Sequence, residues 1–179
     1  MADIQNRKTR PRLEINKTQI FIGFAALLLG TLVYIIDRPP GDTYFVSNSG
    51  LPISLHCRFP NLFGAAGNSL PDFIHPFSFI LITAGILSCR RNGHIITSLA
   101  WLTLDLVFEF GQKYKEFSLR LIPECFEGIP FLENSANYFK FGTFDIMDVA
   151  AIILGTLLAF IVLILTDKNL PQNNTCSKF

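Results

Sequence analysis

The segment Ile20–Ile36 reads IFIGFAALLLGTLVYII and carries no charged side chain. An α-helix rises about 1.5 Å per residue, so a run of this length just suffices to cross about 30 Å of hydrocarbon. Basic residues precede the segment, as in a signal peptide, but the apolar run exceeds a signal core of about 7–15 residues and no small-x-small cleavage pattern follows. We therefore predict an uncleaved membrane-spanning helix.

Three further segments are long and mostly apolar: Phe73–Cys89, His94–Gly111 and Val149–Thr166. Together with the first they predict an all-α membrane protein with four transmembrane helices, at about residues 19–36, 72–89, 94–111 and 145–166. These helices form one transmembrane domain over residues 19–166. A basic tail over residues 1–18 precedes this domain, and a short tail over residues 167–179 follows it.

The composition agrees with a membrane protein. Hydrophobic residues make up 50% of the chain and charged residues 16%, whereas a soluble domain has about 25% charged residues. The 15 basic and 14 acidic residues give a net charge of +1, so no basic excess favours nucleic-acid binding, and we exclude that function. The chain has no GxGxxG, Walker or CxxCH motif, and we expect no organic cofactor.

The lysines and arginines predict the orientation, because short cytoplasmic loops retain them. If four helices cross, both tails and the turn at residues 90–93 share one side and carry nine of the 15 basic residues. We therefore expect cytoplasmic N and C termini and two long outer loops, at residues 37–71 and 112–143. The tyrosines then fall at or beyond outer helix ends, where an amphipathic ring suits the membrane interface. They are Tyr34, Tyr44, Tyr114 and Tyr138.

Each outer loop carries one cysteine, Cys57 in the first and Cys125 in the second. An oxidising compartment permits a disulfide between them, and the alternative is two free buried thiols. The second loop is also expected to hold an interfacial helix around residues 117–121. No cysteine or histidine spacing indicates structural zinc.

Polar residues recur in pairs at the predicted outer ends of the last three helices. The pairs are Asp72 with His75, Glu109 with Gln112, and Asp145 with Asp148. An i, i+3 spacing places both members on one helix face, and the predicted topology brings all three pairs to one level. We therefore expect one shared polar site.

Asp105 extends this site inward, because it shares a helix face with Glu109 and lies about a third of the way into the membrane from outside. A carboxylate at this depth costs several kcal/mol on insertion scales and should face the bundle interior or a wet cavity. Two states relieve that cost: protonation of Asp105, or pairing with His75.

Each pair also has a plain structural interpretation. Ser69 or Asp72 could cap the second helix, and Asp145 could be a carboxylate favoured by the helix dipole. His75 could donate to a carbonyl or to Asp72 alone. The side chains at the end of the third helix, Glu109 and Gln112, could extend to the interface.

The motifs around these pairs resemble the VanZ-like family of small bacterial integral membrane proteins. They read Asp72-Phe-Ile-His75, Glu109-Phe-Gly-Gln112, and Gly142-Thr-Phe-Asp145-Ile-Met-Asp148 followed by Gly155, and they cover roughly half the chain. The resemblance implies a multi-pass protein of the bacterial inner membrane that acts in cell-envelope physiology. It also implies a link to glycopeptide antibiotics, because the family's namesake is associated with low-level teicoplanin resistance.

Two positions depart from the family pattern. Gly142 stands shortly before the fourth-helix aspartates, where an arginine is usual, and Lys140 is the nearest cation. Ile152 stands where an asparagine is expected. If these positions contact a ligand in relatives, this chain binds a different ligand or none.

Three functions fit the pattern. The first is a non-enzymatic envelope protein whose outward polar pocket binds a lipid head group, a cell-wall precursor or a partner protein. The second is a membrane-embedded hydrolase or transferase that acts on a lipid-linked substrate, with His75 or Glu109 as acid or base and Ser78 as a weak nucleophile candidate. The third is proton-coupled transport through Asp105 and Glu109. The sequence leaves the oligomeric state and a divalent metal beside the carboxylates open.

Overall fold

A computed structural model describes residues 15–37, 62–64, 66–87, 91–126, 129, 132 and 135–167. Over this part of the chain the structure is all-helical, with six α-helices and one 3-10 turn. Four helices are long and apolar enough to cross a membrane. They are α1 (Lys17–Asp37), α2 (Ala66–Leu87), α3 (Arg91–Lys113) and α6 (Ile146–Asp167). The four predicted spans are thus confirmed as long apolar helices.

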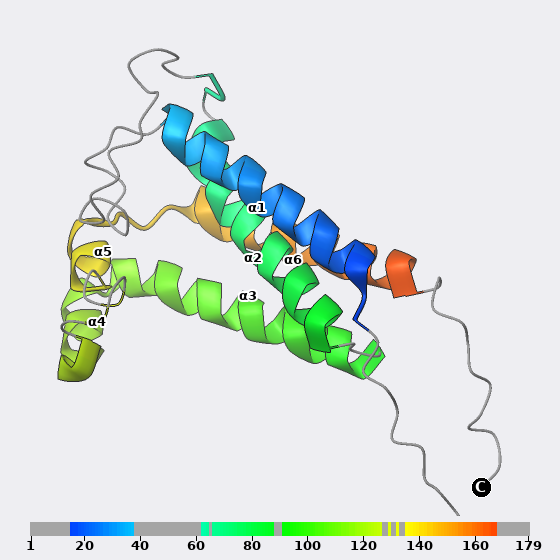
Figure 1. The fold of residues 1–179 in the computed structure, drawn as a ribbon. Coiled ribbons are helices and arrows are strands. Elements are labelled where there is room, and N and C mark those ends of the chain that lie inside the picture. The colour runs from blue at the N-terminus through cyan, green and yellow to red at the C-terminus, as the bar shows by residue number, and fades with distance from the viewer. Residues whose placement is uncertain are drawn as a thin grey trace, which may run out of the picture.

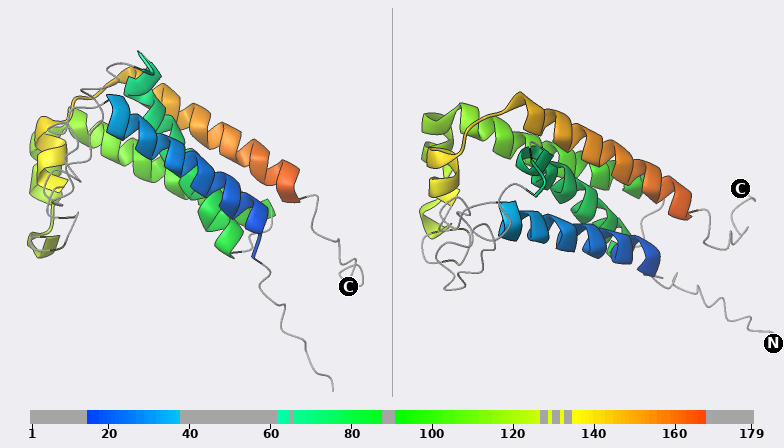
Figure 2. Two further views of the ribbon diagram at one scale, coloured as in Figure 1. Left: turned by 45° about the horizontal axis from the view of Figure 1, so that its top comes forward. Right: turned by 90° about the horizontal axis from the view of Figure 1, so that it is seen from above.

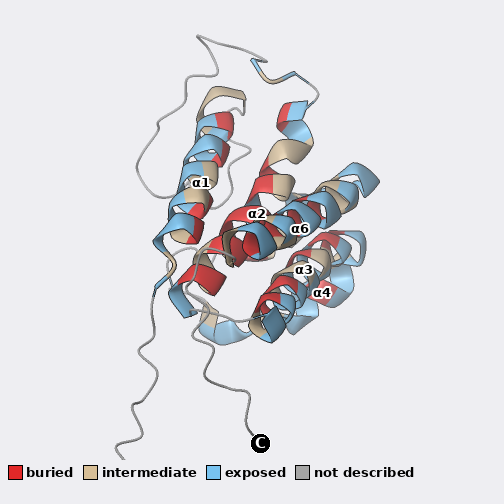
Figure 3. Ribbon diagram, turned by 90° about the vertical axis from the view of Figure 1, so that its right-hand side faces the viewer, coloured by how far each residue is buried: buried red, intermediate tan, exposed pale blue. Residues whose placement is uncertain are grey.

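The four long helices form a bundle around α2. Helix α2 packs extensively against α1 and α6, and α3 packs against both α6 and α2. Figure 3 shows α1 on one side of α2, with α3 and α6 on the other. The core between α2 and α6 is apolar and fully buried around Ile80, Leu81 and Leu163.

The first turn of α1 and the last turn of α6 lie together at one end of the bundle (Figures 1 and 2). The side-chain amide of Gln19 donates to Thr166 Oγ1 at 2.9 Å and joins these two helix ends. At the opposite end α3 finishes, α2 and α6 begin, and the short helices gather. The ends of the helices that carry the three predicted polar pairs therefore meet, as the sequence pattern required.

Helix α2 begins at Ala66, six residues before the predicted start at Asp72. The capping interpretation of Ser69 and Asp72 is therefore wrong, because both residues lie inside the helix. Pro71 suggested a boundary, since proline lacks the N–H that would donate to the carbonyl of Gly67. Membrane helices tolerate internal proline where neighbouring groups compensate, and α2 contains a second one, Pro76.

Close helix contacts depend on glycines. The carbonyl of Phe73 on α2 lies against Gly155 on α6, so closely that a Cβ at position 155 would overlap it. A Cβ at Gly30 on α1 would lie 3.0 Å from the side chain of Ile74 on α2. These glycines therefore allow close helix packing within the chain.

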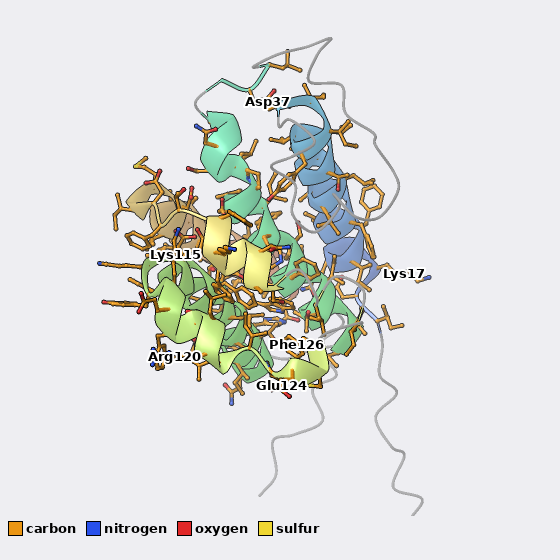
Figure 4. All side chains as sticks on the ribbon, turned by 90° about the vertical axis from the view of Figure 1, so that its left-hand side faces the viewer. Lys17, Asp37, Lys115, Arg120, Glu124 and Phe126 are labelled. Carbon is orange, nitrogen blue, oxygen red and sulfur yellow. The ribbon has the colours of Figure 1, made fainter. Side chains whose placement is uncertain are left out.

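The connection between α3 and α6 contains the predicted short helix at residues 117–121, observed as α4 (Lys115–Leu121). It also contains a 3-10 turn, η2 (Glu124–Phe126), and an unexpected helix α5 (Ser135–Phe141). Ser118 Oγ donates to the carbonyl of Gly111 at 3.0 Å and holds α4 against the end of α3. Figure 4 shows α4 and α5 in front of the long helices, at the end where α3 finishes.

Candidate functional site

A cavity of about 440 Å³ lies between α1 and α3, with α2 as its floor and α5 at its end. Its polar lining residues are Thr31, Tyr34, Asp72, His75, Asp105, Glu109 and Tyr138. Its apolar lining residues include Leu27, Ile74, Leu104, Phe108 and Ile152. The volume falls in the range of about 300–1,000 Å³ that is usual for small-molecule sites. Four of the seven sequence-predicted site residues line this pocket.

The centre of the pocket is a hydrogen bond between His75 of α2 and Asp105 of α3. His75 Nδ1 lies 3.0 Å from Asp105 Oδ1, and the His75 side chain is 48% exposed whereas that of Asp105 is 9% exposed. Pairing with His75 is thus the alternative that the structure realises for Asp105. When Asp105 is ionised it can only accept, so Nδ1 carries the proton and Nε2 remains as an acceptor.

Asp105 has a second oxygen that is buried and unsatisfied. Its Oδ2 has no hydrogen-bond partner among the described residues. Buried carboxylate oxygens are normally hydrogen-bonded, so an orphaned one beside a cavity favours a ligand or water at that position.

The imidazole of His75 is held by aromatic rings on its other side. Its centroid lies 4.6 Å from Phe79 and 5.9 Å from Trp101, and these two rings stack at 4.8 Å. Trp101 Nε1 donates to Thr83 Oγ1 at 3.1 Å, which fixes the indole between α3 and α2. These ring contacts support the orientation in which His75 meets Asp105.

Glu109 has a positioning role. The interfacial interpretation of this residue is wrong, since it is 3% exposed, and its Oε1 accepts the backbone N–H of Asp145 at 2.9 Å. Asp145 Oδ1 in turn accepts the N–H of Met147 at 2.9 Å and caps the start of α6. The predicted helix-terminal role of Asp145 is therefore confirmed, and Glu109 ties that helix start to α3. Asp148 follows in the first turn of α6.

Gln112 is also buried rather than interfacial, and its side chain hydrogen-bonds to Tyr138 of α5. Burial raises the pKa of Tyr138, and the nearby carboxylate of Asp72 raises it further. Gly142 lies against the Gln112 amide, where a Cβ would come within 2.8 Å of it. Helix α5 thus closes the end of the pocket through Tyr138. A side chain larger than that of glycine at position 142 would overlap the Gln112 amide.

The charged side chains of the pocket lining are carboxylates. Over the described parts of the chain it contains three carboxyl groups and no lysine or arginine. No group of three or more histidine, cysteine, aspartate or glutamate side chains is placed to hold a metal ion within those parts. The arrangement therefore offers hydrogen-bond acceptors and negative charge to whatever enters.

Beyond Gln112, Asp145 and Asp148, two further residues considered from the sequence do not line the pocket. Ser78 is fully buried and does not line it, so its candidacy as a nucleophile has no support. Cys125 is exposed in η2, and its predicted disulfide partner Cys57 lies outside the described residues. The disulfide stays a prediction.

Three lining residues were not recognised as part of the site: Tyr34, Trp101 and Tyr138. The tyrosines flank apolar runs, which predicts interface anchors, whereas the structure places Tyr34 of α1 and Tyr138 of α5 in the pocket lining. Trp101 had a usable signal, because it lies four residues before Asp105 and so shares its helix face.

No protein-family model, curated protein or solved structure matches this chain in any of the three comparisons.

Proposed function

We propose that this chain is a VanZ-like multi-pass protein of the bacterial inner membrane that binds an amine-bearing lipid head group in the pocket of His75 and Asp105. Both termini are cytoplasmic and the pocket opens at the outer face. The observation that carries the proposal is the buried, unpartnered Oδ2 of Asp105 beside a cavity without lysine or arginine in its described lining.

The lining selects for donors and positive charge. An ammonium group offers three donors and no acceptor, which complements Asp105 Oδ2, the free face of His75 and the carboxylate of Asp72. An anionic group would meet three carboxyl groups without a cation to compensate, so its binding is disfavoured.

The position of the pocket supports a lipid rather than a soluble amine. It lies between α1 and α3, and these helices each pack on α2 without forming a principal contact with each other. The apolar lining residue Leu27 lies at the middle of α1, and Leu104 lies one residue nearer the middle of α3 than Asp105 does. A head group can therefore occupy the polar centre while its acyl or prenyl chain lies in the groove between the two helices.

The two departures from the VanZ-like pattern fall at this site. Ile152 lines the pocket, and Gly142 packs against Gln112. An arginine and an asparagine at these positions would add donors, so this chain has a more acidic and more apolar site than the family pattern implies. We propose that it shares the family's role in the cell envelope and its link to glycopeptide resistance, and that its own ligand is cationic.

The outward opening is tested by membrane-impermeant thiol labelling of intact cells. Single cysteines replace exposed residues of a background in which Cys57, Cys89, Cys125 and Cys176 are serine. Glu116→Cys and Thr143→Cys lie at the pocket end, and Lys17→Cys and Asn92→Cys lie at the other end. We expect labelling from outside for the first pair only. Labelling of the second pair alone would invert the orientation.

The ligand is tested by native mass spectrometry of the lipids retained after purification in a mild detergent. Wild-type protein should retain phosphatidylethanolamine or an amine-bearing cell-wall precursor over phosphatidylglycerol, and the mass distinguishes these two sources. Asp105→Asn should lose that preference. Glu116→Gln, which changes an exposed carboxylate on α4, is the matched control and should keep it. Equal retention by all three proteins contradicts the proposal.

A second function, acid–base catalysis on a lipid-linked substrate, is favoured by one observation. The Asp105 hydrogen bond orients His75 as in a general-base dyad, with Nε2 left to take a proton. Glu109 is a weaker candidate because it is engaged with the backbone of Asp145. Turnover of a lipid-linked substrate by wild-type protein, abolished in His75→Gln and preserved in Glu109→Gln, would establish it.

A further inference from the structure

Helix α3 has an unusual distribution of side chains for a membrane span. Every residue that is buried on it is polar. These residues are His94, Thr97, Ser98, Asp105, Glu109 and Gln112. Its large aliphatic side chains, such as Ile96, Leu99 and Val107, are instead exposed. The helix thus presents its apolar face outward, as expected toward lipid, and its polar face toward α2 and α6.

The polar face extends over the length of the span. From His94 to Gln112 the helix rises about 27 Å, close to the thickness of about 30 Å of the hydrocarbon core. Gln112 lies at the pocket end, and His94 lies in the first turn of α3, next to the exposed Arg91 and Asn92. The buried polar face therefore connects the pocket with the opposite end of the bundle.

Several atoms on and beside this face lack protein partners. Asp105 Oδ2, Ser98 Oγ and His94 Nε2 are buried on α3 without a hydrogen bond to any described residue. Ser78 Oγ on α2 and Thr156 Oγ1 on α6 are in the same condition, and both helices pack on α3. Buried polar atoms of this kind hydrogen-bond to internal water in folded proteins, because an orphaned polar group in a low-dielectric interior is costly.

We propose that this polar face is a hydrated proton path that links the His75–Asp105 pocket to the other side of the membrane. A proton that leaves the His75–Asp105 pair passes along water held by the hydroxyls of Ser98 and Thr156 to the imidazole of His94. From His94 the proton passes to bulk water at the exposed start of α3. No covalent bond other than O–H and N–H changes, and the path needs no further reactant.

The other titratable groups around the path lie at its two ends. At the pocket end they include Asp72 on α2, Glu109 and Lys113 on α3, Asp145 and Asp148 at the start of α6, Tyr34 and Asp37 on α1, and Tyr138 on α5. At the far end the described charged groups are Lys17, Arg91 and Asp167, at the ends of α1, α3 and α6. Between Asp105 and His94 no other residue of α3 is charged, so the hydroxyls and water carry the intermediate steps.

Proton flux into proteoliposomes tests the path. Purified protein is reconstituted in phosphatidylglycerol and phosphatidylcholine vesicles with a trapped pH-sensitive dye, and a valinomycin-induced potassium potential drives proton entry. We expect flux above protein-free vesicles, with Asp105→Asn reducing it by about tenfold or more and His94→Gln reducing it several-fold. These vesicles contain no amine lipid, so the outcome does not depend on the proposed ligand.

A matched pair of threonine variants separates the path from a general change in the bundle. Thr156→Val removes a buried, unpartnered hydroxyl, whereas Thr103→Val makes the same change on the exposed face of α3. The first should lower the flux and the second should leave it unchanged. Flux no higher than in empty vesicles, or equal flux in the wild-type protein and the Asp105 and Thr156 variants, would overturn the proposal.

Discussion

His75 and Asp105, 30 residues apart in the sequence, are joined at 3.0 Å across the interface of α2 and α3. The pair combines a half-exposed imidazole with a buried carboxylate, so it connects the surface of the pocket to the interior of the bundle. It also explains how an apolar helix can carry Asp105, because the partner compensates part of the cost of burying a charge.

Removal of the imidazole should destabilise the bundle. His75→Ala leaves both oxygens of Asp105 without a partner, and we expect the free energy of unfolding to fall by about 1–2 kcal/mol. His75→Asn retains a donor near the position of Nδ1 and should recover much of the loss. Circular dichroism during SDS titration in mixed micelles measures both. An alanine variant as stable as the wild type would show that the pair contributes nothing.

Glu109 should stabilise the protein through the hydrogen bond that its Oε1 accepts rather than through its charge. Glu109→Ala frees the N–H of Asp145 and loosens the start of α6, and should cost about 1–3 kcal/mol of stability. Glu109→Gln keeps an oxygen in the same place and should cost much less. The same SDS titration measures this contrast. If both variants lose the same stability, the charge, and not the hydrogen bond to Asp145, is what matters.

Gly155 should tolerate no side chain. Gly155→Ala drives a methyl group into the backbone of Phe73, so α2 and α6 must separate, with an expected loss of about 1–3 kcal/mol. Gly111→Ala is the comparison, because its close neighbour is the ring of Phe139, which can move. Thermal unfolding in detergent should rank Gly155→Ala as the less stable variant, and the reverse order would contradict the packing described for α2 and α6.

Tyr138 gives the protein a specific sensitivity to high pH. Its folded-state pKa is raised above the usual value near 10, so stability is independent of this group below that pH. Above it the unfolded chain loses the phenolic proton while the folded protein retains it, and stability falls by up to about 1.4 kcal/mol per pH unit.

The Tyr138→Phe variant isolates this effect. The free energy of unfolding is measured for the wild type and for the variant between pH 9 and 11. The value for the wild type minus the value for the variant should fall as the pH rises. A difference that does not depend on pH would show that the phenol is not protonated more strongly in the folded state.

The sequence predicted the spans well because the length of a membrane helix is set by the hydrocarbon it crosses. The observed α1, α3 and α6 agree with their predicted ranges to within three residues at each end. The start of α2 was missed because Pro71 is a helix-ending signal in soluble proteins, whereas here the helix continues through it.

The convergence of the polar pairs was also predictable, since it follows from i, i+3 spacing and from helices that alternate in direction. The roles of the individual residues were not. The hydrogen bond from the N–H of Asp145 to Glu109 depends on the path of the loop before α6. The inward position of Tyr138 depends on where α5 docks. Neither is encoded in a local pattern.

The central claim is that the His75–Asp105 pocket recognises an amine-bearing lipid, and Trp101 reports on it directly. It is the single tryptophan of the chain, it lines the pocket, and its ring lies 5.9 Å from that of His75. Its fluorescence is measured in phosphatidylglycerol nanodiscs with a rising fraction of phosphatidylethanolamine. Phosphatidylcholine, whose head group has no N–H donors, is the comparison.

We predict a saturable change with phosphatidylethanolamine that is absent with phosphatidylcholine and is weakened about tenfold or more in Asp105→Asn. Equal responses to the two lipids, or a response that Asp105→Asn leaves unchanged, would contradict the claim.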